Sequence, residues 1–184
     1  TPIGYQPSET QSLDFFTDEF APIFERDLQL MAAAGVNAIR IYSLTTDEGS
    51  SHREFFDACE AHGISVMVGF ELQAAHHRLN DDVGFAKVKF ELTTQLLLLQ
   101  HDGAMPRSLA MFFVGNELNL PSNGFICETN CQFDGTQFDF FAERIDDLCK
   151  IVVEHGLLCT SPLAEYDLPE AKRGPAGKAT AWFE

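Results

Sequence analysis

The chain has 184 residues, of which 45% are hydrophobic and 22% are charged, and these values are ordinary for a soluble globular domain. Its formal net charge of −16 disfavours nucleic acid or an anionic membrane surface as a partner, because both attract clustered Lys and Arg side chains. No apolar run approaches the roughly 20 residues that a membrane span needs. The chain begins with Thr1 rather than Met, so we expect a processed or trimmed start.

Amphipathic helices alternate with apolar strands along the chain. Apolar residues at helical spacing predict four helices, at residues 20–35, 50–63, 83–101 and 138–156. An apolar run follows each helix and a short one precedes the first, which predicts strands at residues 1–7, 36–44, 64–72, 108–118 and 157–166. Strands of this kind separated by helices indicate a parallel sheet with covered faces.

Two helix starts carry local signals. Ser51 and Glu54 have the spacing of a capping box, in which each residue satisfies a backbone N–H of the other. Asp81 and Asp82 precede the third helix, where the positive end of the helix dipole favours acidic side chains.

Two architectures fit this order of elements. One is a (β/α)₈ barrel of the TIM type, which typically needs about 250 residues and would be represented here by its first five β/α units. The other is a complete five-stranded doubly wound sheet. The chain ends at "ATAWFE", a helix-like fragment with no strand after it, which favours a single partial barrel domain over residues 1–184.

Both architectures bind ligands at the carboxyl ends of their strands. These ends are rich in aromatic, amide and charged side chains, namely Tyr5, Arg40, Tyr42, Glu71, Asn116, Glu117, Asn119, Glu165 and Tyr166. Aromatic faces stack on sugar rings, and amides and carboxylates bond to hydroxyl groups, so this set indicates a sugar site. A nucleotide site would show a glycine-rich turn after the first strand, and "GYQPSE" is not such a turn.

Structural roles remain open for several of these residues. Arg40 lies within an apolar run and needs a partner, because a buried unpaired charge is costly, so both an ion pair and a site role are compatible with the pattern. Tyr5 and Tyr42 fit a core position as well as a binding site. Glu117 fits an ordinary loop acid as well as a reactive one.

Three segments carry a family resemblance. "GYQP" on the first strand, "GVNAIRIYSL" on the second and "FFVGNELN" on the fourth resemble clan A glycoside hydrolases, most of all the fungal β-1,3-glucanosyltransferases and related glucanases, over residues 3–120. The resemblance implies that Glu117 is the general acid/base and that Asn116 holds the 2-hydroxyl of the sugar. It also implies that Arg40 supports the carboxylates and that Tyr5 and Tyr42 line the cleft.

The resemblance further implies a retaining hydrolase or transglycosylase that acts on a β-glucan-type polysaccharide. That mechanism needs a second carboxylate, the nucleophile, about 5–5.5 Å from the acid. In the family the nucleophile is a glutamate that ends the seventh strand, which places it outside this chain. We expect Glu71, Asn119 and Tyr166 to contact the substrate from the same rim. The alternative is a non-catalytic glucan-binding or structural extracellular protein with the same fold.

The pairing of the five cysteines indicates whether the protein resides in an oxidising or a reducing compartment. Cys127 and Cys131, in "CETNC", predict a disulfide that closes a small loop, with two free thiols as the alternative. A disulfide would indicate a secreted, extracellular or cell-wall protein. Cys59, Cys149 and Cys159 fall within apolar patterns, where cysteine often acts as a buried hydrophobic residue.

The sequence indicates no metal and no organic cofactor. We expect a polysaccharide or oligosaccharide as the partner. If the barrel is incomplete, we also expect an oligomer or a partner chain, because unpaired strand edges invite association.

Overall fold

A computed structural model describes most of the chain. It covers residues 3–4, 15–44, 50–70, 72, 79, 81–116 and 135–162, with residues 3–4 and 135–139 described by backbone only. The helices are η1 (Asp18–Phe20), α1 (Ala21–Ala33), α2 (Arg53–Ala61), α3 (Asp82–Leu98) and α4 (Gly135–Glu154). The strands are β1 (Ile3–Gly4), β2 (Ala38–Ile41), β3 (Ser65–Phe70), β4 (Leu109–Val114) and β5 (Leu158–Thr160).

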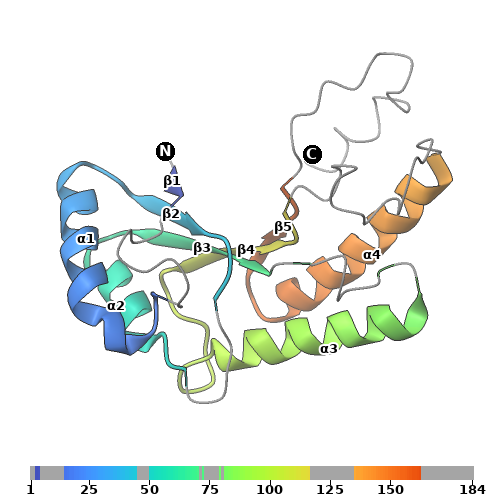
Figure 1. The fold of residues 1–184 in the computed structure, drawn as a ribbon, viewed down its shortest axis with the longest axis horizontal. Coiled ribbons are helices and arrows are strands. Elements are labelled where there is room, and N and C mark those ends of the chain that lie inside the picture. Colours follow the sequence, from blue (N-terminus) through green and yellow to red (C-terminus); the bar gives the residue numbers. More distant parts are fainter. Residues whose placement is uncertain are drawn as a thin grey trace, which may run out of the picture.

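The strands form one parallel sheet in the order β1-β2-β3-β4-β5 (Figure 1). Each strand therefore lies beside the strand that precedes it in the chain. A doubly wound sheet reverses its strand order at a switch point, whereas the strands of a barrel follow one another around the axis. The observed order confirms the predicted barrel type over the doubly wound alternative, and the described part comprises five strands and four α-helices.

Helices pack on one face of the sheet. The strand side chains on that face are fully buried and comprise Ile39, Ile41, Val66, Val68, Phe112 and Val114. They form one hydrophobic cluster with buried residues of all four α-helices, among them Phe24, Phe55, Phe85 and Leu148. Strand side chains alternate between faces, so Arg40, Met67 and Met111 belong to the opposite face, where they are only partly buried. Within the described residues, helices cover only one face, whereas the apolar strands predict cover on both.

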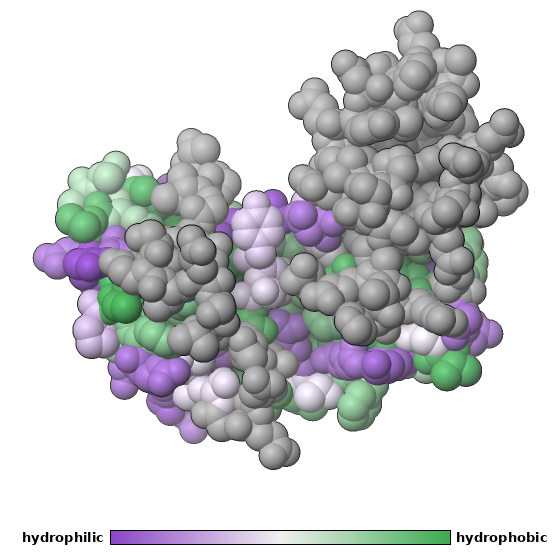
Figure 2. All heavy atoms as spheres, viewed as in Figure 1, coloured by the Kyte–Doolittle hydropathy of each residue, from purple (hydrophilic) through white to green (hydrophobic). Residues whose placement is uncertain are grey.

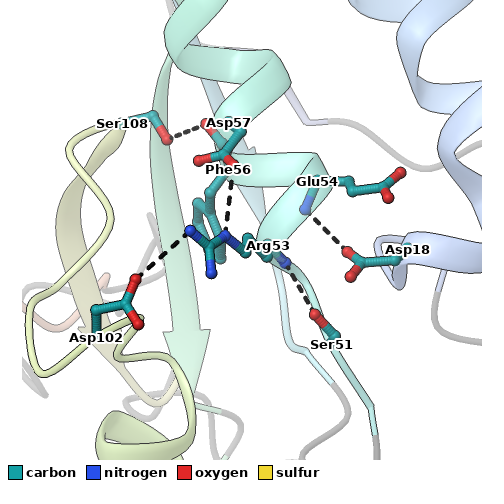
Figure 3. A network of polar contacts seen from close by, with 8 residues as sticks. All are labelled: Asp18, Ser51, Arg53, Glu54, Phe56, Asp57, Asp102 and Ser108. Carbon is teal, nitrogen blue, oxygen red and sulfur yellow. Dashed lines mark hydrogen bonds and ion pairs between the residues drawn. The ribbon is translucent and has the colours of Figure 1, made fainter.

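The amino end of α2 is capped by another segment (Figure 3). The backbone N–H of Glu54 donates to Oδ1 of Asp18 at 2.9 Å, and the N-cap residue is His52. Ser51 lies one residue before the N-cap, and its Oγ accepts only a long bond, of 3.4 Å, from the backbone N–H of Arg53. The predicted Ser51–Glu54 capping box is therefore wrong. Asp18 takes its place because its carboxylate both accepts the bond and faces the positive end of the helix dipole.

Acidic residues lie at the amino end of α3, as predicted, and one of them also caps the helix. Oδ1 of Asp81 accepts a bond from the backbone N–H of Gly84 at 2.6 Å. The next residue, Asp82, pairs with Arg144 of α4 at 2.6 Å, and the guanidinium carbon of Arg144 lies 4.2 Å from the centre of the Phe85 ring. The start of α3 is thus held both by its own cap and by α4.

A disulfide joins α4 to β5. Cys149 and Cys159 are bonded, with their Cα atoms 5.3 Å apart, so their interpretation as buried hydrophobic thiols is wrong. An apolar pattern does not distinguish the two cases, because both residues do pack against the core. Cys59 is a fully buried free thiol, as predicted, and burial raises the pKa of that thiol. Cys127 and Cys131 lie outside the described residues.

We expect the double substitution Cys149→Ser/Cys159→Ser to lower the free energy of unfolding by about 2–3 kcal/mol. Without the disulfide the unfolded chain gains conformational entropy, which favours the unfolded state. Urea unfolding of both proteins under non-reducing conditions measures the difference. Cys59→Ala is the control, because it leaves the disulfide intact. Free thiols at Cys149 and Cys159 in a non-reducing peptide map would contradict the assignment.

Candidate functional site

The carboxyl ends of β2, β3 and β4 lie side by side. In the parallel register Ile41 pairs with Val68, and Phe70 pairs with Val114. The backbone N–H of Gly115, just after β4, donates to the carbonyl oxygen of Phe70 at 2.8 Å. The residues that follow these strands therefore meet at one edge of the sheet. In (β/α)₈ barrels this edge carries the ligand site.

Arg40 is the central side chain at this edge. It lies between Ile39 and Ile41, whose side chains pack against the helices, so Arg40 belongs to the opposite face of the sheet. Its Nη2 donates to Oδ1 of Asn116 at 2.5 Å, across 76 residues of sequence. This bond links the end of β2 to the turn that follows β4.

Two aromatic rings flank the Arg40 guanidinium. Its central carbon lies 4.7 Å from the ring centre of Tyr42 and 4.7 Å from that of Phe113. The negative face of an aromatic ring attracts a cation, and this attraction grows when the cation is partly desolvated. The rings and the amide thus stabilise the positive charge within the described part of the chain, and they restrict the guanidinium to one orientation.

The bond to Arg40 also decides which way the Asn116 amide points. A guanidinium only donates hydrogen bonds, so the amide oxygen of Asn116 has to face Arg40. The Nδ2 group is then directed away from Arg40, as a donor for another acceptor. Among the residues that the structure describes, the buried Nε of Arg40 has no hydrogen-bond partner. The Nδ2 group of Asn116 is a donor suited to a hydroxyl or carboxylate oxygen.

Three predicted site residues come together in the structure. Arg40 and Asn116 are in direct contact, as the predicted rim requires. Tyr42 has 58% of its surface exposed, so its interpretation as a core aromatic is wrong and it presents one ring face to solvent beside Arg40. Predicted residues outside the described part of the chain are Tyr5, Glu71, Glu117, Asn119, Glu165 and Tyr166.

Phe113 belongs to the site although no sequence motif marks it. It lies beside Phe112 in the apolar run that predicts the fourth strand. Adjacent strand residues point to opposite faces, so only one of the two phenylalanines can join the helix-side core. Phe112 does so, whereas Phe113, although 7% exposed, lies outside that cluster and against Arg40. The alternation was therefore the available signal.

Two other kinds of feature are absent from the described residues. They contain no group of three His, Cys, Asp or Glu side chains placed to hold a metal ion. They also contain no helix that is both long and apolar enough to cross a membrane.

Several solved structures share this fold. Saccharomyces cerevisiae Gas2p in complex with laminaritriose and laminaritetraose is 22% identical with a TM-score of 0.52, and the match covers 83% of this chain and 31% of that one. A Gas2p mutant with laminaritetraose and laminaripentaose is 21% identical with a TM-score of 0.57, over 90% of this chain and 34% of that one. Gas2p with laminaripentaose is 19% identical with a TM-score of 0.58, and the match covers 92% of this chain and 37% of that one.

These likenesses concern the fold. The chain spans about a third of the length of the Gas2p chains, in agreement with a barrel represented by its amino-terminal units. Gas2p is a fungal β-1,3-glucanosyltransferase, which agrees with the resemblance noted in the sequence. No protein-family model and no curated protein matches the sequence.

Gly69 of β3 sets the spacing at this edge. A Cβ atom at this position would collide with the backbone carbonyl oxygen of Tyr42. We expect Gly69→Ala to force β2 and β3 apart and to lower the free energy of unfolding by about 1–3 kcal/mol, measured by urea unfolding.

Gly156→Ala is the matched control, because its backbone has a φ of +82° and no atom lies within 4 Å of the added Cβ. We expect it to cost only the strain of a left-handed residue, about 1–2 kcal/mol, and to leave ligand binding unchanged. If Gly69→Ala left the near-ultraviolet signal of Tyr42 and its ligand binding unchanged as well, the close approach would not matter to the site.

Proposed function

We propose that the protein is a retaining glycoside hydrolase or transglycosylase that acts on a β-glucan-type polysaccharide. The observation that carries the proposal is the contact between Arg40 and Asn116 beside an exposed aromatic ring, at the carboxyl ends of parallel strands. The likeness of the fold to Gas2p, which was solved with laminari-oligosaccharides, supports a glucan as the ligand.

The proposed chemistry assigns both proton transfers to Glu117. This residue directly follows Asn116 in the chain, and in the proposal it protonates the glycosidic oxygen as the bond breaks. A second carboxylate, outside these 184 residues, attacks the sugar carbon and forms the covalent intermediate. Glu117 then takes a proton from water or from the hydroxyl of an acceptor sugar, which gives hydrolysis or transfer.

The other groups bind and orient the sugar. Asn116 donates through Nδ2 to the 2-hydroxyl, because Arg40 already occupies its oxygen. Tyr42 offers a ring face to the substrate, and Tyr5 and Tyr166 are assigned the same role from neighbouring strand ends. Glu71 and Asn119 are assigned bonds to further hydroxyl groups.

The proposal includes an extracellular or cell-wall location. The disulfide between Cys149 and Cys159 supports it, because disulfides persist in oxidising compartments.

A non-catalytic glucan-binding protein of the same fold is the second candidate. The feature that favours it is the chemistry of the contacting groups, because a guanidinium, an amide and two aromatic rings bind a sugar without transferring a proton. Turnover separates the two candidates.

We expect Glu117→Gln to lower turnover of laminari-oligosaccharides by roughly 100- to 10,000-fold, because the amide cannot protonate the leaving oxygen. Binding, measured by calorimetry, should be retained. Glu154→Gln, an exposed position on α4, is the control that should leave both unchanged. Binding without turnover in the unsubstituted full-length protein would favour the second candidate, and the absence of both would refute the proposed function.

Asn116→Asp tests the polarity of the site. A carboxylate here keeps an acceptor for Arg40, now with charge assistance, so we expect the stability to be equal or higher. The donor Nδ2–H is lost, so we expect affinity for laminari-oligosaccharides to fall about 10- to 100-fold. Asn37→Asp, at an exposed residue before β2, is the control for the added charge. Unchanged affinity would contradict the assigned orientation of the amide.

A further inference from the structure

The outer face of α3 is unusually apolar. Its inner face is buried in the core through Phe85, Val88, Leu92 and Leu96. The exposed apolar residues of the same helix are Val83 at 83%, Phe90 at 72%, Leu97 at 55% and Leu98 at 47%. Figure 1 shows α3 along the lower edge of the molecule, with no other labelled element beyond it, and in Figure 2 green side chains lie between purple ones along this edge. Large apolar side chains gathered on one exposed helix face often mark a surface that packs against another molecule.

Val83, Phe90 and Leu97 are seven residues apart and form one line, here called the α3 stripe. Residues at this spacing drift only about 20° per heptad around a helix, so the three side chains share one face. The stripe extends about 21 Å along the helix, since each residue advances about 1.5 Å. The seam between two packed helices carries apolar residues at two positions of each heptad, and the α3 stripe supplies one of these two positions.

We propose that the α3 stripe is the contact between two copies of this chain, in which α3 packs antiparallel against α3 of the second copy. The two-fold axis passes beside Phe90. Val83 then faces Leu97 of the second copy, and the two Phe90 rings meet at the centre. A two-fold contact uses the same surface on both subunits, and the stripe satisfies that condition because its apolar residues are spaced symmetrically about Phe90.

The charged neighbours of the stripe fit the same arrangement. Lys87 and Glu91 lie on one side of it and pair within the helix at 3.4 Å. The two-fold axis at Phe90 brings Lys87 to within about 3 Å, along the helix axis, of Glu91 of the second copy. The same holds for the reciprocal pair, so opposite charges meet on both halves of the contact.

The charge of the whole chain also favours this face for self-association. With a net charge of −16, two copies repel each other over most of their surfaces. Within α3 the residues Asp82, Lys87, Lys89 and Glu91 balance, with two acidic and two basic side chains. Repulsion is therefore small where the α3 stripes would meet. This contact is independent of the proposed function, because it lies on the side of α3 that faces away from the sheet.

Sedimentation of the purified full-length protein, from about 1 µM to about 1 mM, tests the proposal. We expect a concentration-dependent equilibrium between monomer and dimer. Phe90→Glu should weaken it about 100-fold or more, because two carboxylates would meet in the apolar centre. Leu30→Glu, at a residue of α1 that is 64% exposed, is the matched control and should leave the equilibrium unchanged.

A cysteine cross-link tests the antiparallel register. In Phe90→Cys the two new thiols face each other across the axis and should form a covalent dimer on mild oxidation. In Val83→Cys they lie about 21 Å apart along the helix axis and should not. A protein that stays monomeric, a dimer that survives Phe90→Glu, or equal cross-linking of the two cysteine variants would overturn the proposal.

Discussion

The candidate site depends on the hydrogen bond from Arg40 to Asn116 at the edge of the sheet. Two aromatic rings pack against the same guanidinium. A charge placed within an apolar strand is costly unless it is solvated by other groups, and here an amide oxygen and two ring faces do so. The same contacts fix the guanidinium, and the guanidinium fixes the amide. Gly69, on the strand between β2 and β4, allows this close approach. A Cβ atom at this position would collide with the backbone carbonyl oxygen of Tyr42.

The scaffold explains why these groups meet. Strands that follow one another in space as in sequence bring their carboxyl ends to one edge, and helices on one face leave the other face to Arg40 and Phe113. Contacts between elements hold this arrangement at several points. Asp18 caps α2, Arg144 holds the start of α3, and a disulfide fixes β5 to α4. The outer side of α3 is a second surface, separate from the strand ends, with chemistry suited to a helix rather than to a sugar.

Much of the fold could be predicted because it is encoded in local periodicity. The alternation of four helices with five strands and the caps at Asp81 follow from residues close together in sequence. The bond between Arg40 and Asn116, which are 76 residues apart, could not be predicted from local periodicity. The contact of Phe113 with Arg40 could not be predicted in this way either. Tyr42 illustrates the limit, since its position after a strand was compatible with a core or a cleft until its exposure was known.

The sequence by itself determined the type of each described element and predicted the edge of the sheet at which Arg40 and Asn116 meet. Tertiary structure alone decided the strand order, the pairing of Cys149 with Cys159, the capping of α2 by Asp18, and the rings that flank Arg40. The physical reason is the range of the interactions. Helix and strand periodicities depend on residues a few positions apart. These contacts join segments that are distant in sequence, and no local pattern indicates that they are close in space.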